Sequence, residues 1–167
     1  MEIIKINERK KRYLPLLLLG DEQESMIDRY LEAGELYVLR EGETPLAVCV
    51  VTRPAPDTAE IKNLAVDPRF QRRGLGRRMV DFAAAAYAGR CSRLLVGTGD
   101  SPLTIPFYRS CGFRESHRVP NFFTHHYDHP IFEGGRRLTD LVYFQMELPR
   151  QAGMPPARES ERAEGSP

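Results

Sequence analysis

Four arginines surround two glycines at one point of the chain, directly before an alanine-rich stretch. The run reads VDPRFQRRGLGRRMVDFAAAA, with Arg72, Arg73, Arg77 and Arg78 around Gly74 and Gly76. A helix N-terminus carries partial positive charge and ordinarily favours acidic residues in its first turn. Arginines there, beside glycines that let the backbone approach a ligand, are typical of a phosphate-binding turn. The stretch therefore predicts a polyphosphate site, with an exposed arginine-rich turn as the alternative interpretation.

Two other nucleotide-binding motifs do not fit this stretch. A dinucleotide-binding turn of the Rossmann type needs a third glycine where Met79 or Val80 stands. A P-loop needs Gly-Lys followed by Ser or Thr, which this sequence lacks. The predicted phosphate site is therefore of another kind.

A second group of chemically capable side chains lies in the C-terminal third. All four histidines fall between His117 and His129, and His125, His126, Asp128 and His129 are of types that bind metals. Their spacing is local and no cysteine lies among them, so we expect no metal site.

The cysteines point to a reducing compartment. Cys49, Cys91 and Cys111 are odd in number and widely spaced, which is not a disulfide pattern. No His or Asp stands in a recognisable pairing with Cys111, so we do not expect a covalent cysteine mechanism.

The bulk properties indicate one globular domain without a strong charge field. The chain has 167 residues, 41% of them hydrophobic and 28% charged, and a net charge of +1. Binding to nucleic acid through overall basic charge is therefore not expected. The apolar run LPLLLLG is too short for a membrane span and contains proline, so we expect a cytoplasmic protein without membrane contact.

The elements that must hold these residues follow from hydrophobic periodicity and turn signals. Helices are predicted over 8–19, 21–33, 75–88 and 101–111, the last bent or restarted at Pro106. Strands are predicted over 1–6, 58–66, 93–99, 113–119 and 141–148, with a hairpin over 36–53. Residues 121–139 are expected to form a long loop, and 149–167 a disordered C-terminal tail after a domain over 1–148.

The stretch LAVDPRFQRRGLGRRMV resembles the acetyl-CoA-binding motif Q/R-x-x-G-x-G/A of the GNAT N-acetyltransferases. Gln71, Gly74 and Gly76 fill its fixed positions, and the order of elements matches the family from about Leu36 to Leu148. The resemblance implies an α/β GNAT fold, with a mixed central sheet of six to seven strands flanked by about four helices. It also implies that the fourth and fifth strands splay apart.

The resemblance implies acetyl-CoA as cosubstrate and no metal. The backbone between Gln71 and Arg77 would hold the pyrophosphate, through Gln71, Arg72, Arg73, Gly74, Leu75, Gly76 and Arg77. The pantetheine arm would run along Leu64, Ala65 and Val66, with the Val66 N–H directed at the thioester oxygen. Asp100 stands where many members have an asparagine that contacts pantetheine.

Two residues match the groups that move protons in this family. Glu60 lies where several members carry a general base, and Tyr108 in FYRSCGF matches a general acid. Period-two geometry would place Glu60, Lys62, Leu64 and Val66 on one face of their strand, unless Lys62 points across the cleft mouth. The alternatives are a solvent-exposed glutamate at a strand edge and a tyrosine that only packs against the sheet.

The acceptor side is predicted in the segment between the last two strands. His125, Tyr127, Asp128 and Glu133 are candidates to recognise a small-molecule amine or a protein amine, with a polar surface loop as the alternative. The implied reaction is N-acetylation of a primary amine by direct attack in a ternary complex. A coenzyme A-binding sensor without chemistry is the competing function, and the resemblance leaves homodimerisation open.

Overall fold

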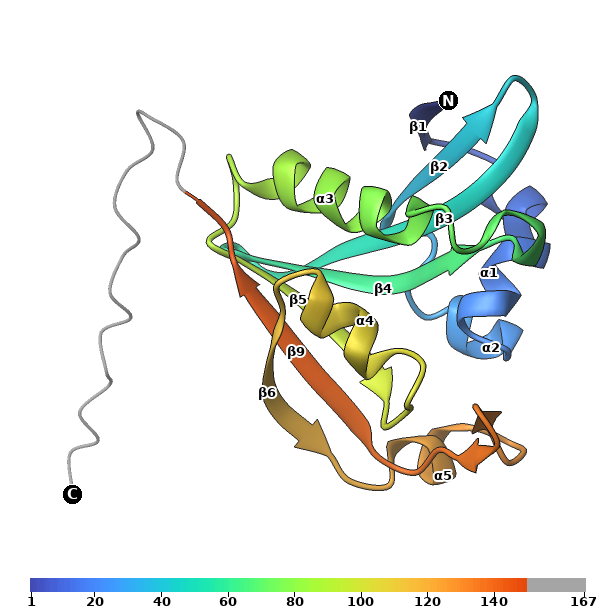
Figure 1. Ribbon diagram of the computed structural model, residues 1–167, viewed down its shortest axis with the longest axis vertical. Helices are drawn as coiled ribbons and strands as arrows, with labels where there is room; N and C mark the ends of the chain where they lie inside the picture. Colours follow the sequence, from blue (N-terminus) through green and yellow to red (C-terminus); the bar gives the residue numbers. More distant parts are fainter. Residues whose placement is uncertain (150–167) are drawn as a thin grey trace.

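The computed structural model describes residues 1–149 and has a seven-stranded mixed sheet with the order β1-β2-β3-β4-β5-β9-β6 (Figure 1). The strands are β1 (Glu2–Ile6), β2 (Glu35–Glu41), β3 (Thr44–Ala55), β4 (Thr58–Val66), β5 (Arg93–Gly99), β6 (Arg114–Val119) and β9 (Leu141–Glu147). The helices of this part of the chain are α1 (Leu14–Gly20), α2 (Glu24–Ile27), α3 (Leu75–Tyr87), α4 (Ile105–Ser110) and α5 (Phe122–His126). Short 3-10 turns cover Lys10–Tyr13 and Pro68–Phe70.

Helices cover both faces of the sheet, because alternate residues of β2 and β3 are apolar on both sides. Tyr37, Leu39 and Cys49 face the core under α3 and α4, which includes Met79 and Tyr87. The residues between them, such as Val38 and Val50, face a second core under α1 and α2. The sheet is therefore the middle layer of three, and its central strands are buried from both sides.

The sheet opens between β4 and β5, the one parallel pair among the strands described. Their pairing covers only Thr58–Ile61 of β4 against Arg93–Val96 of β5. Both strands continue, β4 to Val66 and β5 to Gly99, and Figure 1 shows them diverging. The predicted splay is confirmed, and it leaves backbone groups of two strands without a strand partner.

A bulge in β4 overturns the prediction that Glu60, Lys62, Leu64 and Val66 share one face. Asn63 pairs with Val50 and Ile61 with Val51, so Lys62 is an extra residue in the strand. A bulge of this kind shifts the alternation by one position. Leu64 and Val66 therefore pack toward the α3 core, whereas Lys62 forms an ion pair with Glu60 and lies over the ring of Tyr30.

Other local predictions also needed correction. The segment predicted as one helix over 21–33 forms only the four-residue α2 followed by turns, and α4 begins at Ile105 with Pro106 in its first turn. The expected loop 121–139 contains α5 and a small hairpin of β7 (Phe132–Glu133) and β8 (Arg136–Arg137). The tail predicted for 149–167 falls, apart from Pro149, outside the described residues.

Candidate active site

A cavity of about 600 Å³ lies where β4 and β5 part. Its walls come from both splayed strands, from the start of α2, from α4, and from the segment between β6 and β9. Gly97 and Gly99 line it on β5; a Cβ at Gly99 would collide with Leu138 at 2.5 Å, and one at Gly97 would lie close to Leu141 at 3.2 Å. Of the predicted site residues, the cavity is lined by Glu60, Leu64, Tyr108, Tyr127 and Glu133.

The open edge of β4 offers backbone groups to a ligand. The N–H of Asp67 donates to the carbonyl of Leu46 on β3, at 2.9 Å. Because backbone groups of an antiparallel strand alternate in direction, the N–H groups of Val66 and Leu64 then point to the opposite edge, which β5 does not pair. This is the arrangement predicted for a pantetheine arm that adds to the strand.

Ala65 does not share this arrangement. Its backbone faces β3 by the same alternation, and its side chain is buried in the core under α1 and α2. Neither the backbone nor the side chain of Ala65 therefore lies on the open edge, and the predicted contact between Ala65 and the ligand is not supported.

The turn before α3 has the backbone expected of a phosphate site. Gly74 is the N-cap residue of α3 with φ of 74°, and Arg72 is also left-handed with φ of 63°. The first turn of the 13-residue helix contains no acidic residue, and no side chain caps it. Its first N–H groups, including those of Leu75 and Gly76, are therefore available to an anion.

Two further contacts fix this turn. The side-chain amide of Gln71 donates to the carbonyl of Val66 at 3.1 Å, which ties the turn to the open edge of β4. A Cβ at Gly76 would lie 3.2 Å from the ring of Phe107 on α4, so Gly76 permits α3 and α4 to approach closely. Gly74 is thus needed for its backbone conformation, and Gly76 for the close packing of α3 against α4.

The arginines of the motif are not equivalent. Arg73 lies over the ring of Phe70, and neither it nor Arg72 forms an ion pair with an acid of residues 1–149. Arg77 donates to the carbonyl of Ser110 and lies 4.0 Å from Asp81, whereas Arg78 donates to the carbonyl of Met1. Arg72 and Arg73 are therefore the cations best placed to meet phosphate oxygens beside the helix N-terminus.

Tyr108 lies on the wall of the cavity with its ring in the core. It is 7% exposed, its ring centroid is 5.7 Å from that of Phe113, and it stacks on Phe144 at 6.5 Å. Burial raises its pKa above the ordinary tyrosine value, and the neighbouring acidic groups, including Glu133, add to this. The phenol is therefore protonated at neutral pH and able to donate a proton.

Glu60 is 8% exposed and lines the cavity from β4. One carboxylate oxygen lies 2.8 Å from the Nζ of Lys62, the bulged residue. The alternative of a solvent-exposed glutamate at a strand edge is therefore excluded. An ammonium nitrogen already lies within hydrogen-bond distance of this carboxylate, which is the chemistry that an amine acceptor would present there.

A chain of hydrogen bonds that the sequence did not reveal forms the far wall of the cavity. The hydroxyl groups of Tyr127 and Tyr30 donate to the carboxylate of Asp21, at 2.7 and 3.1 Å. The amide of Asn63 donates to the Tyr30 hydroxyl and to the carbonyl of Leu17, at 3.0 and 2.9 Å. Burial raises the pKa of Asp21, although both tyrosines oppose this. Acid-rich DEQE after Gly20 was the only signal in the sequence for Asp21.

The remaining predicted acceptor residues divide between cavity and surface. Glu133, on β7, lines the cavity, and burial raises its pKa. His125 is exposed and lies outside the cavity, and Asp128 borders a separate hollow of about 220 Å³. The sequence could not separate the two groups, since α5 and the β7–β8 hairpin decide which side chains turn inward.

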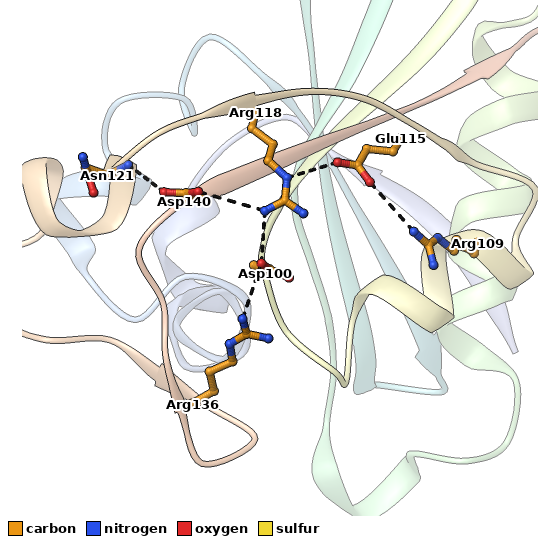
Figure 2. Close-up of polar contacts among 7 residues, drawn as sticks. All are labelled: Asp100, Arg109, Glu115, Arg118, Asn121, Arg136 and Asp140. Carbon is orange, nitrogen blue, oxygen red and sulfur yellow. Dashed lines mark hydrogen bonds and ion pairs between the residues drawn. The ribbon is translucent and has the colours of Figure 1, made fainter.

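Asp100 belongs to an ion-pair network rather than to the cavity wall (Figure 2). Its Oδ2 lies 3.1 Å from Nη1 of Arg118 on β6 and 3.6 Å from Nη2 of Arg136 on β8. Arg118 also pairs with Glu115, and Asp140 accepts the backbone N–H of Asn121. The side chain predicted to contact pantetheine is thus engaged in joining the end of β5 to β6 and to the hairpin.

Other chemistries find no support in residues 1–149. Cys111 is buried and its pKa is raised by burial, so its thiol remains protonated. That part of the chain contains no group of three or more His, Cys, Asp or Glu side chains positioned to hold a metal ion. No helix in it is both long enough and apolar enough to span a bilayer.

Comparison with known proteins agrees with this geometry. Residues 32–115 match the family model described as the acetyltransferase (GNAT) domain. A Bacillus subtilis protein named Uncharacterized N-acetyltransferase YvbK is 36% identical over 135 residues, which is 80% of this chain and 87% of that protein.

Solved structures extend the likeness to the whole fold. A GNAT family acetyltransferase from Elizabethkingia anophelis, with acetyl-CoA bound, is 32% identical with a TM-score of 0.84, over 88% of this chain and 97% of that one. An acetyltransferase of Bacillus subtilis in complex with CoA is also 32% identical, with a TM-score of 0.77, over 88% of this chain and 98% of that one.

Proposed function

Because the chain belongs to the GNAT family and is thus an acetyl-CoA-dependent acyltransferase, we propose that it acetylates a primary amine by direct attack in a ternary complex. The observation that carries this proposal is the cavity between β4 and β5, which brings Glu60 and Tyr108 to one space. A module that only senses coenzyme A has no need of both groups.

The residues present fit the cosubstrate. The helix N-terminus at Gly74 to Arg77, with Arg72 and Arg73 beside it, would hold the pyrophosphate. The open edge at Leu64 and Val66 would hold the pantetheine arm. When bound, acetyl-CoA supplies an activated acetyl group as its thioester.

Each end of the reaction has a protein group to assist it. An alkylammonium has a pKa of about 10.4, so it must lose a proton before its nitrogen can attack, and Glu60 takes that proton directly or through water. A bond forms between the amine nitrogen and the carbonyl carbon as the carbon–sulfur bond breaks. The Val66 N–H stabilises the charge that develops on the carbonyl oxygen, and Tyr108 gives its hydroxyl proton to the departing thiolate. The nitrogen loses its second proton as the amide forms, and this proton returns the Tyr108 phenolate to the phenol through water.

Replacement of Tyr108 by phenylalanine tests this assignment. We expect Tyr108→Phe to lower kcat by about 100-fold, because general acid catalysis contributes on that order, while the affinity for acetyl-CoA is kept. The edge contact with Phe113 and the stacking on Phe144 do not need the hydroxyl, so the fold should persist. The measurement is thiol release with a panel of amines, with acetyl-CoA affinity measured by calorimetry.

Tyr87→Phe is the matched control for a lost buried hydroxyl. Tyr87 is fully buried, and its hydroxyl contacts that of Tyr37 in the α3 core. The kcat of the Tyr87→Phe variant should equal that of the native enzyme. Unchanged turnover in Tyr108→Phe would remove Tyr108 from the mechanism, and binding of acetyl-CoA without thiol release from any amine would favour the sensor function.

A further inference from the structure

Contacts between two segments far apart in the sequence border the acceptor side of the cavity. The Tyr127 hydroxyl donates to Asp21, and the backbone N–H of Asp128 donates to Oε1 of Gln23 at 3.1 Å. The imidazole of His129 lies 3.3 Å from Glu22. This bridge joins the α1–α2 connection to the segment after α5, and the cavity of about 600 Å³ behind it has the size of a small-molecule site.

The cavity has more negative than positive side chains. Four carboxylates line it, those of Asp21, Glu22, Glu60 and Glu133, against two cations, Arg29 and Lys62. Glu60 pairs with Lys62 and Glu22 with His129. Within residues 1–149, neither Asp21 nor Glu133 has a cationic group within 4.0 Å, although both are half-buried. Half-buried carboxylates without a counter-charge favour a cationic ligand.

An unpaired hydrogen-bond acceptor also lies in this wall. Asn63 lines the cavity and is 3% exposed, and its Oδ1 is the one buried side-chain atom without a hydrogen-bond partner in the part of the chain described. Its Nδ2 already donates to Leu17 and Tyr30. This oxygen is packed against Gly20, where an added Cβ would lie 2.2 Å from it, so Asn63 shapes the wall and its oxygen is not a contact for a ligand.

Aromatic rings complete the surroundings for a cation. Tyr30, Tyr127, Phe122, Phe132 and Tyr143 line the same cavity. The Nζ of Lys62 already lies 5.9 Å from the ring centroid of Tyr30, within the range of cation–π attraction. The rings would also cover an aliphatic chain between two charged ends.

We propose, on the basis of the acetyl transfer proposed above, that the acceptor is a small aliphatic amine with a second positive charge. Its reacting nitrogen lies near Glu60 and Tyr108, and its second cation is neutralised by Asp21 and Glu133. A diamine has this chemistry.

The test compares acceptors of equal length that differ in the second charge. Thiol release is measured with butane-1,4-diamine, butan-1-amine and 4-aminobutanoate, and with a peptide that has a free N-terminal alanine. We expect kcat/KM for the diamine to exceed that for the monoamine by about tenfold or more, as one charged hydrogen bond implies. The amino acid and the peptide should be poorer still.

Two variants connect the preference to the named carboxylates. Glu133→Gln and Asp21→Asn should each lower the ratio of kcat/KM for the diamine to kcat/KM for the monoamine about tenfold. Glu43→Gln, on the exposed turn between β2 and β3, is the control and should change neither. The acetyl-CoA affinity of each variant reports whether its fold is intact.

The outcomes separate this inference from the proposed function. Equal efficiency with the monoamine, or preference for the amino acid or the peptide, would overturn the inference and leave amine acetylation standing. Variants that lose monoamine and diamine activity in the same proportion would also overturn it. Absence of thiol release from every acceptor, in an enzyme that binds acetyl-CoA, would overturn the proposed function and this inference together.

Discussion

Gly74 shows how a single residue can determine whether the turn before α3, proposed to bind phosphate, can form. Its φ of 74° lies in the left-handed region, where a side chain is strained even though a Cβ would meet no atom within 4 Å. The residue is therefore required for its backbone conformation and not for space. Gly42, in the turn between β2 and β3, has the same two properties with φ of 58° and lies outside the cavity.

These two glycines make a matched pair of substitutions. Gly74→Ala and Gly42→Ala should each lower the free energy of unfolding by about 1 kcal/mol, because alanine is less favourable at positive φ. Only Gly74→Ala should also weaken acetyl-CoA binding, by about tenfold, since the turn no longer directs its N–H groups at one point. Chemical denaturation and calorimetry measure the two effects. Equal affinities in both variants would show that this turn does not bind the phosphates.

At the scale of elements, the bridge across the acceptor side contains a titratable contact. His129 lies between Asp128 and Glu22, and hydrogen bonds to these carboxylates, first to Asp128, raise its pKa. A raised pKa means that the folded state favours the protonated imidazole. The stabilisation is complete below the pKa of the unfolded chain, about 6.5, and is lost as pH rises through the higher pKa of the folded state.

The bridge should therefore loosen as pH increases. Amide hydrogen exchange in 21–23 and 127–129, corrected for intrinsic rates, should be slower at about pH 6 than at about pH 8. His129→Gln should remove most of this difference, while exchange in the β2–β3 turn should be the same in both proteins. A pH dependence that survives unchanged in the variant would assign it to another group.

The ion-pair network of Figure 2 acts at the same scale. Asp100 contacts Arg118 of β6 and Arg136 of β8, so it connects the end of β5 to two elements that follow it in the chain. Exposed pairs of this kind stabilise a protein little. Their value lies in orientation, because the hairpin that they hold carries Glu133 into the cavity.

At the scale of the whole molecule, the division of the sheet into two parts explains why ligand binding should increase the free energy of unfolding. The two parts of the sheet pair directly only over Thr58–Ile61 and Arg93–Val96, and the cavity lies beyond. A ligand at the open edges contacts both parts of the sheet, and it can do so only when the chain is folded. Binding then adds RT ln(1 + [L]/Kd) to the free energy of unfolding, about 2.7 kcal/mol at a hundredfold excess over Kd.

Coenzyme A should therefore raise the melting temperature by about 5–10 °C at that excess. ATP at the same concentration should raise it much less, because it has phosphates but no arm for the open edge of β4. Differential scanning calorimetry of the full chain measures both shifts. A shift with ATP as large as that with coenzyme A would show that the phosphate turn alone accounts for binding.

Much of this molecule could be predicted from local pattern. Two β-rich runs separated by EGETP specified the hairpin of β2 and β3, and QRRGLG before an alanine-rich run specified a glycine turn at the start of α3. These features depend on residues a few positions apart, whose dihedral preferences and periodicity act before any distant contact forms. The motif carried the family resemblance, and the resemblance implied the α/β fold with splayed strands; both are confirmed.

Only the tertiary structure decided which side chains meet in the cavity. The bulge at Lys62 depends on register with β3, and it reversed the faces predicted for β4. Asp21 and Tyr127 are 106 residues apart in the sequence and meet through one hydrogen bond. Such contacts have no local signal, because they arise from how packed layers align distant segments and not from the preferences of either segment. The sequence by itself determined the family and the turn before α3, and folding determined which charged side chains line the cavity.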